Sequence, residues 1–67
     1  MVEPREKPTV NFLGIDGNSL SIVGHVKDAL RKAGADEEYV KNYQMEALSG
    51  NYDHLLVVTM EYVHVNC

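Results

Sequence analysis

A link of two residues, Gly34-Ala35, constrains the fold of this chain more than any other feature, because it joins two stretches with helical periodicity. In the stretch before the link, apolar residues recur every three or four positions, which predicts a helix with one buried face. These residues are Ile22, Val23, Val26, Ala29, Leu30 and Ala33. Since so short a link cannot carry the chain far, the two helices must be neighbours in space.

Capping residues predict the limits of both helices. Asn18 and Asp36 are good N-caps, while Gly34 and Ser49-Gly50 are typical of helix ends. The two glutamates that follow Asp36 favour the positive end of the helix dipole. The predicted buried stripe of the second helix consists of Val40, Tyr43, Ala47 and Leu48.

Residues 52–66 are ambiguous, because their pattern fits one helix, a strand, or a helix followed by a strand. We expect a helix from Tyr52 to Tyr62, begun by Asn51 or Asp53, and an extended stretch after it. The residues that fit its helical stripe are Leu55, Leu56, Thr59, Met60 and Val63.

The residues before the first helix predict a strand from Thr9 to Ile15, with Val10 and Phe12 on one face. A lone strand leaves its backbone groups unpaired, and residues 63–66 are the other extended candidate. We therefore expect the two ends of the chain to pair in one sheet. The open edges of such a sheet also predict self-association, through a strand edge and nearby tyrosines.

The chain length limits what this fold can contain. A chain of 67 residues makes one domain and buries only roughly 60% of the surface that it exposes when unfolded. We expect a small single α+β domain over residues 8–67, with an N-terminal strand, two to three helices and a short C-terminal strand. Residues 1–7 are charged and contain proline, which predicts a mobile N-terminal tail.

Composition excludes several classes of protein. No apolar run reaches the roughly 18 residues of a membrane span, and the charged N-terminus does not fit a signal peptide. The single cysteine, Cys67, cannot form an internal disulfide, which predicts a reducing, cytoplasmic location. The net charge of −4 opposes bulk attraction to nucleic acid or to an anionic membrane.

The turn Asp16-Gly17-Asn18 is the first candidate ligand site. A calcium loop that starts at Asp16 would need a glutamate at its twelfth position, where this chain has Lys27. One glycine is also too few for a phosphate loop, and the aspartate would repel the anion. We expect these three residues to form a structural turn and helix cap.

The histidines do not form a metal or catalytic pattern. His25, His54 and His64 lack the spacing of a helical metal pair, and a zinc site needs roughly four ligands. No Cys–His or Ser–His–Asp arrangement has a defensible spacing. The sequence therefore predicts no catalytic, metal-binding or cofactor-binding residue.

Lys27, Arg31 and Lys32 form a small basic edge on the first helix, and Lys41 could extend it. Two helices joined by a tight turn can bind DNA, but the second helix should then be basic. Here it carries four acidic residues, counting its cap. We expect a solvated basic face, paired in part with those acids.

Four tyrosines are many for a chain without tryptophan. Tyr39, Tyr43, Tyr52 and Tyr62 suit either the edge of a core or a surface for self-association or a protein partner.

Gly24 is unusual in its position, because a glycine inside a helix costs about 1 kcal/mol relative to alanine. We expect another backbone to pack closely against Gly24; the alternative is that it faces a small partner or ligand.

Three sequence blocks occur together: Gly14 to Asn18, Gly24 to Gly34, and Ser49 to Asp53 followed by Met60 to Val63. With them the chain resembles a group of short uncharacterised bacterial proteins, some carried by phages and mobile elements, over roughly residues 11–65. These proteins share G-x-D-G-N, A-L-x-x-A-G and S-G-x-Y-D blocks. The resemblance implies a bacterial or phage origin and an intracellular setting, and it implies no activity.

Two functions follow as expectations. The first is a non-enzymatic interaction or accessory module with a protein partner or a second copy of itself. The alternative is a nucleic-acid-associated regulator of a phage or mobile element. A small hydrolase or metal enzyme has no residue pattern in its favour.

Overall fold

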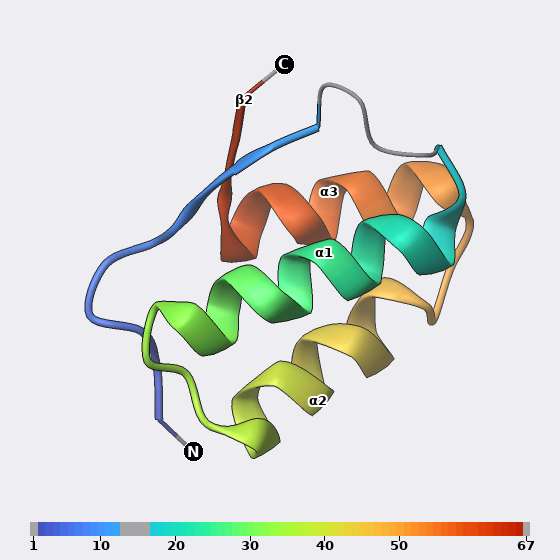
Figure 1. Ribbon diagram of the computed structural model, residues 1–67. Coiled ribbons are helices and arrows are strands. Elements are labelled where there is room, and N and C mark those ends of the chain that lie inside the picture. The colour runs from blue at the N-terminus through green and yellow to red at the C-terminus, as the bar shows by residue number, and fades with distance from the viewer. Residues whose placement is uncertain (1, 13–16, 67) are drawn as a thin grey trace.

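The computed structural model, which describes residues 2–12 and 17–66, has three helices and a two-stranded sheet (Figure 1). Its elements are β1 (Thr9–Asn11), α1 (Ser19–Lys32), α2 (Glu37–Ala47), α3 (Tyr52–Tyr62) and β2 (His64–Asn66). The predicted small α+β fold is confirmed. Of the alternatives for residues 52–66, the helix followed by a strand is correct, with the predicted helix limits.

Each helix begins with a side-chain cap. The side-chain oxygens of Asn18, Asp36 and Asn51 accept bonds of 2.8, 2.9 and 2.9 Å from backbone amides two or three residues further on. The bond to Asp36, from the Tyr39 amide, also holds the pKa of that carboxyl below its ordinary value. These bonds satisfy amides that would otherwise lack a partner at the start of the helix.

The turn between α1 and α2 is closed by backbone bonds around Gly34. The Gly34 amide donates to the Arg31 carbonyl at 3.1 Å, and the Ala35 amide donates to the Leu30 carbonyl at 3.0 Å. This pair of bonds is a Schellman motif, which needs a residue with positive φ, and Gly34 has a φ of 104°. Ala35 then packs into the core, so the two helices are held side by side.

The core lies between the three helices and the sheet. Its apolar members are Val10, Ile22, Val23, Val26, Leu30, Ala35, Val40, Tyr43, Ala47, Leu55, Val58 and Val63. Two residues of the predicted stripes are instead exposed, Leu48 by 39% and Met60 by 54%. Leu48 is the C-cap of α2, where the chain turns away from the helix pair. Met60 lies five residues after Leu55, so it projects well away from the buried side of α3.

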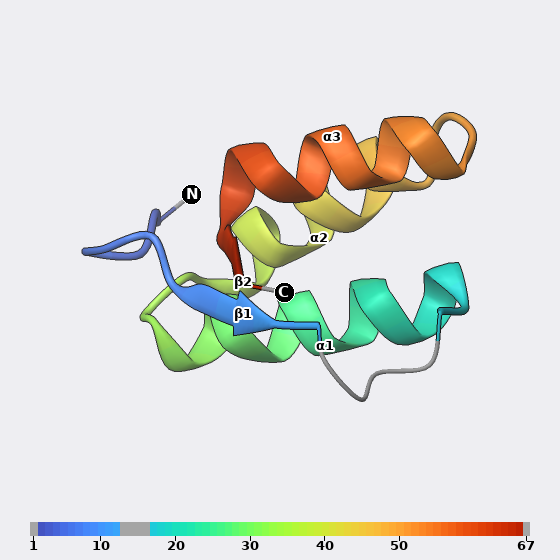
Figure 2. The ribbon, with the colours of Figure 1, turned by 90° about the horizontal axis from the view of Figure 1, so that it is seen from above.

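The two chain ends pair in one sheet, as expected, and the two strands run parallel. The register pairs Thr9 with His64, Val10 with Val65, and Asn11 with Asn66. Figure 2 shows this sheet at one end of the helices, with β1 beside α1 and β2 continuing from α3. β1 ends at Asn11, one residue before the last described residue of the predicted strand, and residues 13–16 lie outside the described residues.

The N-terminal segment is bonded to the helices at both of its ends. The Val2 carbonyl accepts a bond from the Asp36 amide at 3.3 Å. The Lys7 ammonium donates to the Met60 carbonyl at 3.2 Å, near the negative end of the α3 dipole. The expected mobility of residues 1–7 stays a prediction, which limited proteolysis of this segment would test.

Gly24 is not packed against a backbone, so that prediction is wrong. A Cβ added at Gly24 would meet no atom within 4 Å. Gly24 lies two positions from both Ile22 and Val26, and two steps along a helix turn by about 200°, so it faces away from the core.

Replacing Gly24 with alanine should therefore stabilise the chain by up to about 1 kcal/mol, because alanine restricts the unfolded chain without a clash. Urea unfolding measures this change. Gly34→Ala is the matched control and should destabilise, because alanine is strained at a φ of 104°. A loss of stability in Gly24→Ala would contradict the open position of Gly24.

Candidate functional site

Three of the four tyrosines form a cluster between α2 and α3. The ring centroids of Tyr39 and Tyr62 are 5.4 Å apart, and those of Tyr43 and Tyr62 are 5.1 Å apart, both with edge-to-face geometry. Tyr43 is fully buried, and its hydroxyl lies 2.8 Å from the Thr59 hydroxyl. The cluster therefore joins two helices of the same chain.

The polar side of this cluster is closed by the Tyr62 hydroxyl. It donates to Glu46 Oε2 at 2.9 Å and accepts from Asn42 Nδ2 at 3.2 Å. Burial and the bond to Glu46 raise the pKa of Tyr62 to about 12. Tyr62 is therefore a neutral hydrogen-bond donor across the physiological pH range.

The four tyrosines do not form one interaction surface. Tyr43 has no exposed area, so it cannot contact a partner of the folded chain. Tyr52 is 46% exposed, but it begins α3, whereas Tyr62 ends it. The periodicity of α2 does point to burial of Tyr43, whereas the pairing of its ring with Tyr62 depends on how the helices pack.

The histidines make structural contacts or lie at the surface. His54 Nε2 lies 3.0 Å from the Glu46 carbonyl and 3.3 Å from the Ser49 hydroxyl, where it caps the end of α2. His25 and His64 are exposed. Within residues 2–12 and 17–66, no three His, Cys, Asp or Glu side chains are placed to hold one metal ion.

The predicted basic edge divides between two sides of α1. Arg31 forms a two-point contact with Glu37, at 2.7 and 3.2 Å, and lies 3.6 Å from Asp28. The bond from Arg31 lowers the pKa of Glu37 and raises that of Arg31. Lys32 instead borders a hollow beside β1. The expected pairing of basic and acidic residues is thus present at Arg31.

Lys27 and Lys41 border a different hollow, between α1 and α2. The Lys27 ammonium donates to Gln44 Oε1 at 2.8 Å, which bridges the two helices. The hollow has a volume of about 260 Å³ and is lined by Lys27, Arg31, Glu37, Val40, Lys41 and Gln44. Lys41, which was only a possible extension of the basic edge, therefore belongs with Lys27, whereas Lys32 does not.

Exposed apolar side chains continue the same side of the molecule. Leu20 is 68% exposed, Met45 64% and Leu48 39%. Leu20, Gly24 and Lys27 follow one side of α1, because they are spaced by four and three residues. Lys41, Met45 and Leu48 have the same spacing on α2 and its C-cap. We call these six residues the α1–α2 face.

The α1–α2 face was not predicted, although the sequence contains a usable signal for it. Four of its six residues had separate predictions. Leu48 was expected in a buried stripe, Lys27 and Lys41 at the basic edge, and Gly24 against another backbone. The spacing of Lys41, Met45 and Leu48 shows that they share one side of α2. That this side is exposed follows only from the position of α3, which packs on the other side of α2.

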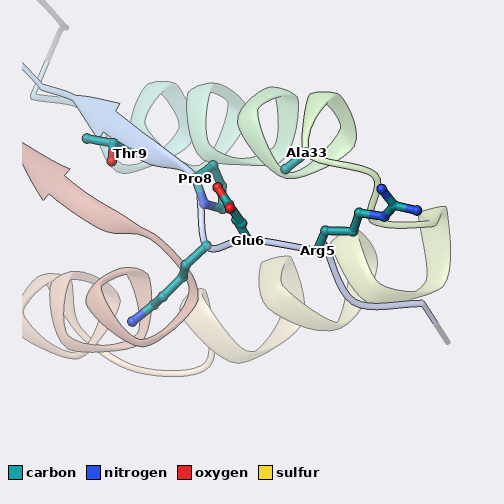
Figure 3. Close-up of a pocket in the computed structure, with 6 residues that line it drawn as sticks. Arg5, Glu6, Pro8, Thr9 and Ala33 are labelled. Atoms are coloured by element: carbon teal, nitrogen blue, oxygen red, sulfur yellow. The ribbon is translucent and has the colours of Figure 1, made fainter.

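A larger hollow lies elsewhere, between the N-terminal segment and the end of α1. It has a volume of about 490 Å³ and is lined by residues 5–9 and Ala33 (Figure 3). In Figure 3 the charged ends of Arg5 and Glu6 extend in different directions and do not converge. A binding site for a small molecule would need polar groups aimed at a common point.

The turn at residues 16–18 is described in part. Asn18 caps α1 as predicted, and an added Cβ at Gly17 would meet no atom within 4 Å. Asp16 lies outside the described residues, so its predicted structural role stays a prediction.

No helix in the described part of the chain is long and apolar enough to span a bilayer.

Comparisons of the chain with protein-family models, with curated proteins and with solved structures found no match. The resemblance to short bacterial and phage proteins therefore stays an expectation. A proposed function has to rest on the geometry of the α1–α2 face.

Proposed function

We propose that this chain is a non-enzymatic interaction module that binds a protein partner through the α1–α2 face. The observation that carries the proposal is the exposure of Leu20, Met45 and Leu48 on the side of the molecule that also presents Lys27 and Lys41. Exposed apolar side chains that are grouped, with a polar border, are typical of protein interfaces. The partner surface should be apolar with acidic residues at its edge.

The other two sides of the helix group support this choice of face. β1 packs on α1 and β2 continues from the end of α3, so the sheet lies over part of the side between α1 and α3. The tyrosine cluster and its bonds to Glu46 and Asn42 close the side between α2 and α3. A partner would have to displace these contacts there, whereas the α1–α2 face, like the outer side of α3, is available without rearrangement.

The proposal is tested by recovery of a partner with variants of the face. The immobilised chain is incubated with a lysate of the organism that encodes it, and bound proteins are quantified by mass spectrometry. We expect a specific protein to bind the unaltered chain and to be lost in Met45→Glu. Val2→Glu places the same charge at another exposed apolar residue and should retain it.

Circular dichroism should confirm that both variants fold. Equal recovery of the same proteins by Met45→Glu and the unaltered chain would contradict the proposal. We also propose that the chain is cytoplasmic and of bacterial or phage origin. Both would decide which lysate contains the partner.

Regulation of a mobile element through nucleic acid is less favoured. Lys27, Arg31 and Lys41 do share a hollow, which would suit phosphate contacts. However, Arg31 is bonded to Glu37 at the same place, and that carboxylate would repel a phosphate. We expect no binding of duplex DNA at physiological salt; binding that is lost in Lys41→Glu would favour this alternative.

A further inference from the structure

The outer side of α3 is a second exposed face with apolar residues. Val57 is 51% exposed and Met60 is 54% exposed. Asp53 shares their side of the helix, since the three residues are spaced by four and three positions. We call Asp53, Val57 and Met60 the α3 face. Its helix contains aspartate and glutamate but no lysine or arginine.

The α3 face and the α2 half of the α1–α2 face have the same spacing and opposite charge. On α2 the order is a cation, Lys41, then apolar residues four and seven positions later, Met45 and Leu48. On α3 the order is an anion, Asp53, then apolar residues four and seven positions later. Two helices that lie side by side in parallel would therefore place the charges together and the apolar residues together.

We propose that the partner of the α1–α2 face is the α3 face of a second copy of this chain. This inference rests on the proposed function and names its partner. In the complex, α3 of the second copy lies parallel to α2, with Asp53 beside Lys41 of the first copy. The bare backbone at Gly24 leaves room for the incoming helix, because nothing lies within 4 Å of the missing Cβ.

The two faces point in opposite directions, which determines the form of the assembly. Figure 2 shows α1 and α3 on opposite sides of the molecule, and Figure 1 shows α2 below both. A copy that uses one face therefore leaves its other face free for the next copy. Such a contact is heterologous, so copies add head to tail.

The contact should be weak and reversible. With 11 residues, α3 is about 16 Å long, so two such helices bury less area than the roughly 1,200 Å² of a stable interface. We expect the average mass in sedimentation to rise steadily with concentration and to pass the mass of a dimer. This behaviour differs from the closed dimer that a shared strand edge would give.

Charge reversal tests the inference with two variants. Lys41→Glu and Asp53→Lys should each weaken self-association by about tenfold or more, because each places like charges together. An equal mixture of the two variants should assemble again, since every contact between unlike copies then joins opposite charges. Sedimentation velocity of each variant and of the mixture measures these effects.

Lys32→Glu is the matched control, since it makes the same change of charge on the other side of α1 and should assemble as the unaltered chain does. A chain that stays monomeric at all concentrations would overturn the inference. Assembly that persists in Lys41→Glu, or that fails to return in the mixture, would overturn the pairing of these faces. If the chain is monomeric but Met45→Glu still loses a lysate partner, the proposed function stands and only the second copy is wrong.

Discussion

Removal of residues 64–67 should cost the chain about 2–5 kcal/mol of stability, because it removes the partner of β1. The deletion removes the bond from the His64 amide to the Pro8 carbonyl, at 2.8 Å, and the acceptor of the Phe12 amide, at 3.1 Å. It also uncovers Val10, which is 3% exposed in the intact chain, by removing its cross-strand neighbour Val65. A domain of this size has a total stability of about 3–10 kcal/mol, so a large part of the truncated chain should be unfolded.

Hydrogen exchange gives the most direct measurement of this loss. The Phe12 amide should exchange slowly in the intact chain and rapidly in the truncated one, and thermal unfolding should shift to lower temperature. A chain that lacks only Cys67 is the control and should keep the protection of Phe12. Retained protection of Phe12 in a truncated monomer would show that the pairing with Asn66 does not stabilise the strand.

Tyr43→Phe should lower stability by about 1–3 kcal/mol, although it removes only one oxygen atom. The Tyr43 hydroxyl is the partner of the Thr59 hydroxyl, and both side chains are fully buried. Without it, the Thr59 hydroxyl is left in the core with a lost hydrogen bond. For a domain of 60–100 residues, each 1 kcal/mol lowers the melting temperature by about 4–8 °C.

A double-mutant cycle isolates this hydrogen bond. Thr59→Val should also destabilise, and the double variant should lose less than the sum of the two single losses, by about 1 kcal/mol. Tyr62→Phe is the matched control, because the Tyr62 hydroxyl is near the surface and water can replace it at Glu46 and Asn42. Strict additivity of Tyr43→Phe and Thr59→Val would contradict the role of the bond.

The limits of the helices could be predicted from the sequence because they depend on local bonds. A cap joins residues that are two or three positions apart, so Asn18 and Asp36 already specify where α1 and α2 begin. Gly34 ends α1 for the same reason, since its amide bonds to a carbonyl three residues earlier. The pairing of β1 with β2 could also be predicted, because a strand needs a hydrogen-bonding partner and the sequence offers one other extended segment.

The parallel direction of that pairing was within reach of the sequence but was not predicted. Short links make each helix reverse the direction of the one before it, as Figure 1 shows. Three reversing helices between two strands bring the second strand back in the direction of the first. The number of helices therefore decided the direction of the strands.

The tertiary structure alone decided which sides of the helices stay exposed. Spacing shows that Lys41, Met45 and Leu48 share one side of α2, but not whether another element covers that side. The sequence likewise predicted that Lys27 and Lys32 belong to one basic edge, whereas in the fold the two residues border different hollows. Exposure depends on where α3 and the sheet pack, and those contacts join residues far apart in the chain. For this reason the capped helices were encoded locally, whereas the α1–α2 face exists only once the whole fold has formed.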